Sequence, residues 1–181
     1  LVAIPATVAL ALLAEPMLAA LFQYGAFGET DRAMAAASLR AYTLGLGAFM
    51  LVKVLAPGFY AQEDMRTPVR IGIIAMAANM VLNVAFVFPL MWWLNLGHVG
   101  LALATSVSAW LNAGLLYRGL RRGAVLPAGS LSLKWLAKII LATAAMGIAL
   151  SWQMPDVDLW QSRHWWQRGI DLGVLCVSGF A

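Results

Sequence analysis

Long apolar runs separated by short polar stretches make up most of the chain. About 20 apolar residues in helical form cross the roughly 30 Å hydrocarbon core of a bilayer. No segment alternates apolar and polar residues with the period of two that is typical of a strand. We therefore expect an all-α, polytopic transmembrane helical bundle of about six membrane helices, with successive helices as antiparallel neighbours. The expected segments are Val2–Phe22, Leu39–Ala61, Val69–Trp92, Val99–Leu120, Leu133–Gln153 and a truncated last one from near Gln167.

Two of these runs contain an internal proline, which removes a helical hydrogen bond and disfavours helix just before it. Glu15-Pro16 predicts a kink or a break in the first segment. Pro57-Gly58 can open the hydrogen-bond ladder near the end of the second. Because broken helices recur at transporter substrate sites, we place Pro57 and Gly58 among the candidate cavity residues.

Composition agrees with a membrane protein: 62% of the 181 residues are hydrophobic, 11% are charged and the mean hydropathy is +0.81. A soluble domain has about 25% charged residues. The net charge of +4 does not indicate a nucleic-acid partner, because the basic residues lie in short loops. One cysteine and two separated histidines leave no disulfide and no metal cluster, so we expect no metal and no cofactor. The chain opens and stops inside apolar runs, and we expect it to be a piece of a longer protein.

Lysine and arginine in the loops set the orientation, since cytoplasmic loops carry more of them. Seven lie on one side (Arg66, Arg70, Arg118, Arg121, Arg122, Lys134, Lys138) and four on the other (Arg32, Arg40, Arg163, Arg168). We place the turns at 62–67 and 118–132 in the cytoplasm, and 24–40, 93–98 and 154–166 outside. Most tryptophans and tyrosines fall near segment ends, as expected at the headgroup level. Trp110 lies mid-segment and is expected to pack against lipid or a neighbouring helix.

Lys53 is the first candidate for function, because a charge inside a membrane helix is costly and should face protein or water. Phe49, Met50 and Pro57 are its helical neighbours. Lys53 either faces a central cavity as a cationic or gating residue, or serves structure by pairing or by extending to the interface. Glu15 either lines a cavity or sits near the outer interface. A pairing of Glu15 with Lys53 is a further hypothesis.

Polar stripes mark two later segments. Asn79 and Asn83 share one helix face, and Thr105, Ser108 and Asn112 share another. Such residues mostly form hydrogen bonds between membrane helices, and substrate contact is the alternative. Ala109 and Ala113 have the small-residue spacing that allows close helix approach. The turn at 62–68 offers Asp64 and Arg66 as a gate contact or as an ordinary solvated loop.

No Walker loop, HExxH, GxSxG or paired acid motif is present, so the sequence offers no catalytic residue and favours a transporter over an enzyme. Three stretches go further: LFQYGAFGETD (Leu21 to Asp31), AYTLGLGAFMLVKVLAPGFYAQEDMRTPVRI (Ala41 to Ile71) and LNAGLLYRGLRR (Leu111 to Arg122). Together they resemble the MurJ/MviN family, lipid II flippases of the multidrug/oligosaccharidyl-lipid/polysaccharide exporter superfamily. The block KVLAPGFYA at Lys53–Ala61 is the most specific part.

This resemblance implies fourteen helices in two lobes of six plus an extra pair. Residues 1–122 would hold four second-lobe segments, and 123–181 the last second-lobe and truncated extra C-terminal helices. It also implies a multi-pass protein of the bacterial cytoplasmic (inner) membrane that moves lipid II between leaflets by alternating access. Lipid II, membrane lipids and cell-wall synthesis proteins are the implied partners. Lys53 matches a lysine of the family motif, whereas nothing here matches the family's first-lobe arginines. An exporter of another polyprenyl-linked sugar or of a drug, and a non-transporting scaffold of the cell-wall machinery, are the alternatives.

Overall fold

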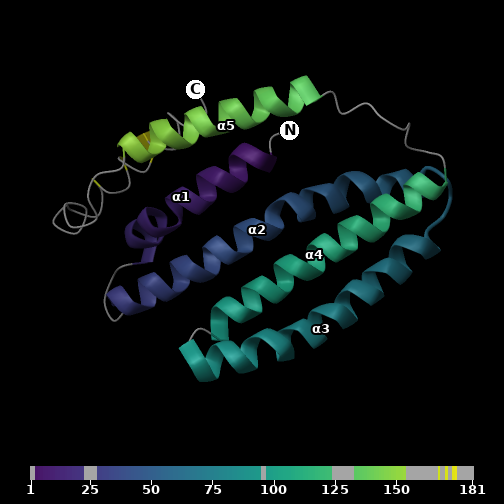
Figure 1. The fold of residues 1–181 in the computed structure, drawn as a ribbon, viewed down its shortest axis with the longest axis horizontal. Helices are drawn as coiled ribbons and strands as arrows, with labels where there is room; N and C mark the ends of the chain where they lie inside the picture. Colours follow the sequence, from purple (N-terminus) through teal and green to yellow (C-terminus); the bar gives the residue numbers. More distant parts are fainter. Residues whose placement is uncertain are drawn as a thin grey trace. The chain divides into compact units, whose positions relative to one another are not determined.

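Five helices form the described part of the chain in the computed structural model (Figure 1). The structure describes residues 3–22, 28–94, 97–123 and 133–153, and the single positions 167, 170, 173 and 174. The helices are α1 (Ala3–Phe22), α2 (Glu29–Tyr60), α3 (Arg66–Leu94), α4 (Gly97–Arg122) and α5 (Leu133–Gln153). The all-helical class is confirmed, and the described residues contain no strand. The expected sixth segment lies almost wholly outside the described residues.

Three of these helices are long and apolar enough to cross a membrane: Thr30–Tyr60, Arg66–Trp92 and Gly97–Arg122. Two shorter apolar stretches, Ala3–Ala19 and Ala137–Trp152, belong to α1 and α5. The expected positions of the segments are thus largely right.

The start of α2 corrects the sequence prediction, because the helix begins ten residues before the expected Leu39. Gly28 is the N-cap. Its carbonyl accepts the first helical bond from the Arg32 N–H at 3.1 Å, and its own N–H donates to Asp31 Oδ2 at 3.0 Å. The bond to Asp31 is the half of a capping box that the residue at N3 supplies, and acidic residues in the first turn suit the helix dipole. Residues 29–40, expected in an outer loop, are helical. The apolar pattern missed them because this stretch is rich in polar side chains.

Proline does not end a helix at the expected place in α1. The helix runs without interruption through Pro16, so of the expected kink or break the break is absent, and the kink stays a prediction. The same holds for Pro57 in α2 and Pro89 in α3. Each proline lacks an N–H, so the carbonyl four residues earlier loses its usual donor. For Pro57 that carbonyl belongs to Lys53.

The chain divides into two compact units: unit 1 comprises residues 1–40 and 133–181, and unit 2 comprises residues 41–132. In unit 1, α1 packs against α5 through Leu13 and Leu150, with Leu12 and Met146 beside them. The lobe assignment of residues 1–122 and 123–181 rests on a different criterion and stays a prediction.

Unit 2 is held together by small residues along the contact between α2 and α4. Ala48 packs against Ala109 and Ala113, which confirms the close approach expected from the spacing of that alanine pair. A Cβ on Gly45 would lie 2.9 Å from the Cα of Ser106. Lipid tails are as apolar as leucine, so membrane helices gain their association from such close packing and from hydrogen bonds.

Two side chains of α4 donate hydrogen bonds to α2 carbonyls. Ser106 Oγ donates to the Ala41 carbonyl at 2.7 Å, and Trp110 Nε1 donates to the Leu44 carbonyl at 2.8 Å. The Trp110 ring lies over Gly47, which confirms its expected packing on a neighbouring helix.

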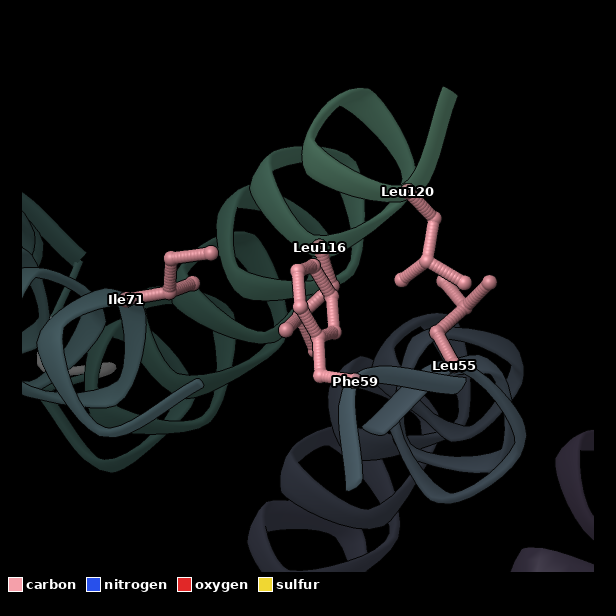
Figure 2. Close-up of a cluster of buried hydrophobic side chains, with 5 residues drawn as sticks. All are labelled: Leu55, Phe59, Ile71, Leu116 and Leu120. Atoms are coloured by element: carbon pink, nitrogen blue, oxygen red, sulfur yellow. The ribbon is translucent and has the colours of Figure 1, made fainter. Parts of the chain in front are cut away.

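Larger side chains fill the contact between the helices where α2 and α4 end and α3 begins. Figure 2 shows Phe59 and Leu55 of α2 meeting α4 and Ile71 of α3. The α4 residues in this cluster are Leu116 and Leu120. Because Ile71 is near the start of α3 and Leu120 near the end of α4, the cluster fixes these two helices as antiparallel neighbours.

Candidate functional site

A polar ladder joins α3 to α4 inside unit 2. Asn83 Nδ2 donates to Asn79 Oδ1 at 3.1 Å, and Asn79 Nδ2 donates to Ser108 Oγ at 3.0 Å, with Thr105 Oγ1 a weaker acceptor at 3.5 Å. The hydroxyls of Thr105 and Ser108 donate to carbonyls of their own helix. The structure thus brings together the two stripes seen in the sequence, and they make the interhelical hydrogen bonds that the sequence favoured.

A groove of about 270 Å³ opens beside this ladder. Residues of α2, α3 and α4 line it: Phe49, Gly72, Ala75, Met76, Asn79, Thr105, Ser108, Ala109 and Asn112. Pockets for drug-sized ligands measure about 300–1,000 Å³. The groove therefore fits a small polar group and not a whole lipid-linked saccharide. Sequence analysis missed Gly72, because its position at the groove depends on the pairing of α3 with α4.

The Asn83 end of the ladder carries an acceptor atom without a partner in the described part of the chain. Asn83 Oδ1 is buried and accepts no hydrogen bond from the described residues. Buried polar atoms usually have a partner. The ladder therefore ends on a buried acceptor that has no partner among the described residues.

Lys53 lies on the side of α2 that faces away from α4. It is exposed, as are its helical neighbours Phe49, Met50 and Pro57. Within the described part of the chain, it makes no hydrogen bond or ion pair. Since Pro57 has no N–H, the Lys53 carbonyl lacks its usual helical donor four residues later.

Gly58 has a packing role, unlike its exposed neighbour Pro57. A Cβ at Gly58 would overlap the end of the Leu120 side chain on α4. Glycine at this position therefore permits close contact of α2 with α4. Pro57 is exposed and Gly58 is half-buried, and a place for either residue at a cavity stays a prediction.

Glu15 forms an ion-pair cluster in unit 1. Its Oε2 accepts a hydrogen bond from the Arg40 guanidinium at 3.2 Å, and its Oε1 lies 3.9 Å from Arg32. The Arg32 side chain is 8% exposed, that of Glu15 30% and that of Arg40 52%. A carboxylate held between two arginines ties α1 to the first half of α2. The sequence did not reveal these partners, and the pairing with Lys53 stays a prediction.

The turn between α2 and α3 is a double cap. Glu63 has a φ of 60°, and the Asp64 N–H donates to the Phe59 carbonyl while the Glu63 N–H donates to the Tyr60 carbonyl. These are the two bonds of a Schellman motif. Asp64 Oδ1 then accepts from the Arg66 and Thr67 N–H groups, each at 3.1 Å. Asp64 thus serves as the N-cap of α3.

The same capping perturbs the titration of Asp64. Hydrogen bonds from the Thr67 side chain and main chain hold the pKa of Asp64 below its usual value. The carboxylate form is therefore the one that the turn favours. The sequence left two interpretations of this turn, a gate contact and a solvated loop. The structure adds a third, a structural cap.

These features define a polytopic helical membrane protein with a charged residue and a polar groove on its membrane helices. The chain belongs to the MurJ family: the model of the family "Lipid II flippase MurJ" matches residues 1–161. A probable lipid II flippase MurJ of Vibrio cholerae is 46% identical over 178 residues, covering 98% of this chain and 33% of the relative. That of Haemophilus influenzae is 42% identical, covering 93% and 32%.

A solved structure titled "Lipid II flippase MurJ, inward closed conformation" has the same fold. The TM-score is 0.72 at 22% identity, over 98% of this chain and 34% of the other. This chain spans about a third of the length of the relatives it matches. Family membership and the three membrane-length helices confirm the expected localisation, a multi-pass protein of the bacterial inner membrane.

Proposed function

We propose that this chain is part of a flippase that moves lipid II, the lipid-linked peptidoglycan precursor, from the inner to the outer leaflet by alternating access. The observation that carries the proposal is the family match over residues 1–161. The family is one of transporters, and we extend this to the proposal that the protein catalyses no covalent reaction. An exporter of other cargo and a cell-wall scaffold are less favoured by this membership.

Lys53 is proposed to face the hydrated path of the whole protein. The cost of a charge among lipid tails is a few kcal/mol on insertion scales, about 3 kcal/mol for lysine. Side chains on a helix lean toward its N-terminus. Lys53 therefore leans toward the middle of α2 and away from the nearer helix end at Tyr60, which disfavours extension to that interface. A water-filled path that passes a diphosphate satisfies the ammonium without this cost.

Pro57 is proposed to make this part of α2 adaptable. The carbonyl of Lys53 lacks its usual donor, so bending here sacrifices one hydrogen bond fewer than elsewhere. The groove, which Asn79 lines, is proposed to hold a hydroxyl or amide of the passing head group, as its small volume allows, with Asn83 orienting Asn79 through their hydrogen bond. Gly58 contributes through helix packing, and Glu15 through the ion pairs that join α1 and α2.

The test is complementation of a flippase-depleted bacterium with the full-length gene, with lipid II in the outer leaflet assayed directly. A charge-assisted hydrogen bond contributes about 1.5–3 kcal/mol, so Lys53→Ala is expected to lower the flipping rate about tenfold or more. Lys53→Arg retains the charge and is expected to retain most of the activity. Val54→Ala is the matched control, because its side chain is the exposed neighbour at 73%.

Membrane levels of each variant are measured alongside, by immunoblot. Rescue by wild type and Val54→Ala but not by Lys53→Ala, at equal levels, supports both proposals. Full rescue by Lys53→Ala reduces Lys53 to a structural residue and leaves the flippase proposal intact. A well-expressed wild type that fails to move lipid II refutes the flippase proposal itself.

A further inference from the structure

The start of α3 and the end of α4 lie at the same end of unit 2 (Figure 1). Five exposed arginines belong to these two helix ends. The cluster that contains Ile71, Leu116 and Leu120 brings these helix ends together (Figure 2). We refer to the place where these five residues lie as the arginine end; they are Arg66, Arg70, Arg118, Arg121 and Arg122.

The arginine end has a surplus of positive charge. The acids beside it in the α2–α3 turn are Glu63 and Asp64, and Asp64 is engaged as the cap of α3. Among the described residues, no ion pair joins these arginines to a carboxylate. Arginines at the start of a helix also oppose its dipole, so helix stability does not account for Arg66 and Arg70. The excess of lysine and arginine in cytoplasmic loops, which sets the orientation of membrane proteins, also explains positive charge at this place, and it requires no bound ligand.

An apolar stripe on α3 continues from two of these arginines. With 3.6 residues per turn, Arg66 and Arg70 share one helix face with a row of exposed residues. The row consists of Ile73 (56% exposed), Val81 (69%), Val84 (63%) and Phe88 (65%), with Ala77 also exposed. From Ile73 to Phe88 it extends about 22 Å, whereas one leaflet of the hydrocarbon core is about 15 Å deep. Acyl chains of one leaflet therefore find a continuous apolar surface directly beside the two arginines.

Tyrosines mark the level of the arginine end in the membrane. Tyr60 and Tyr117 are 50% and 49% exposed and lie on the turns next to it. Tyrosine prefers the headgroup region of a bilayer. The guanidinium groups are accordingly expected at the depth of lipid phosphates, and guanidinium binds phosphate through two parallel hydrogen bonds.

We propose that Arg66, Arg70 and the α3 stripe form a binding site for an anionic phospholipid, with the phosphate on the two arginines and the acyl chains along Ile73–Phe88. The arginines of α4 strengthen the local positive potential without contacting this lipid. The inference does not depend on the flippase activity.

The test is binding of phosphatidylglycerol and phosphatidylcholine, of equal chain length, to the purified full-length protein in neutral detergent, counted by native mass spectrometry. Each basic residue near an anionic surface contributes about fivefold in affinity. Arg66→Gln/Arg70→Gln is therefore expected to lower the preference for phosphatidylglycerol by about 25-fold. Arg66→Lys/Arg70→Lys keeps the charge and is expected to retain part of it, because lysine lacks the two-pronged geometry.

Arg121→Gln/Arg122→Gln is the matched control, since it removes the same charge from the same end but not from the stripe. It is expected to change the preference by no more than about twofold, as screening over about 10 Å predicts. Arg70→Gln alone, with an expected loss of about fivefold, keeps the test open if the double variant does not fold. Circular dichroism and elution profiles check the fold of each variant.

Four results overturn the proposal: no preference in the wild type, full preference in Arg66→Gln/Arg70→Gln, an equal loss in Arg121→Gln/Arg122→Gln, or equal competition by inorganic phosphate or six-carbon phosphatidylglycerol. The third would indicate a general field of charge. The fourth would indicate a phosphate site that does not use the stripe. The proposal is supported if the preference for phosphatidylglycerol depends on long acyl chains and is lost only when Arg66 and Arg70 are replaced.

Discussion

The contact of Gly45 with Ser106 gives the sharpest test of the packing in unit 2. A Cβ at residue 45 would lie 2.8 Å from Ser106 Oγ and 2.9 Å from Ser106 Cα. The second atom belongs to the main chain, so a change of rotamer cannot relieve the contact and α2 must move away from α4. Gly45→Ala is therefore expected to destabilise the protein, even though alanine is the better helix former.

The magnitude follows from opposing effects. Alanine in place of glycine stabilises a helix by about 1 kcal/mol. Overpacking costs about 1–3 kcal/mol, and weakening the bond from Ser106 Oγ to the Ala41 carbonyl costs about 0.6 kcal/mol more. The expected net change is a destabilisation of about 0.5–2.5 kcal/mol.

The matched control is Gly114→Ala on α4, because a Cβ at Gly114 would meet nothing within 4 Å. Helix propensity acts there without a clash, so this variant is expected to be neutral or more stable by up to about 1 kcal/mol. Unfolding of the full-length protein in a detergent series, followed by circular dichroism, measures both. Equal or greater stability of Gly45→Ala relative to Gly114→Ala would refute the close approach of α2 to α4.

Three further outcomes are expected. Glu15→Gln removes the charge that holds two arginines and should lower the unfolding free energy by about 1–2 kcal/mol in the same assay, whereas Glu63→Gln on the exposed turn should change little. Asp64→Ala should lower the Tm at neutral pH. Because the folded pKa of Asp64 is depressed, the carboxylate stabilises the protein above the unfolded pKa of 3.8, and this stabilisation is lost as the pH falls below that value. The Tm values of wild type and Asp64→Ala, measured against pH, should therefore converge in acid. A Tm difference that stays constant with pH would contradict this role. Pro57→Ala restores a helical donor and should slow lipid II export in complementation; unchanged export counts against a flexible α2.

The ion pairs of Glu15 and the double cap at Asp64 share a consequence for motion. The ion pairs tie the first half of α2 to α1, and the cap ties its last residues to the start of α3. Between these fixed points, Pro57 leaves the Lys53 carbonyl without its donor. Any bending of α2 near Lys53, the residue proposed to meet the substrate, is therefore expected to be local, because Ala48, Leu55 and Phe59 hold the same stretch against α4.

The sequence alone determined the class, the family and the approximate positions of five helices. Apolar runs of membrane length and the charges between them are local features of the sequence. The lipid bilayer requires them of each spanning helix, whatever its neighbours are. The tight α2–α3 turn was located correctly for the same reason, although its capping geometry was not foreseen. The block around Lys53 identified the family because residue identity, and not packing, carries that information.

Only the tertiary structure decided where the polar and charged side chains find partners. The helical start at Glu29, the arginines around Glu15 and the ladder from Asn83 to Ser108 were missed or left open. The bond from Ser106 to Ala41 joins residues 65 positions apart, and that from Asn79 to Ser108 joins residues 29 apart. Periodicity places a residue on a face of its own helix, but the partner depends on how the backbones approach. That approach is set by small residues such as Gly45, whose role is visible only once α4 lies against it.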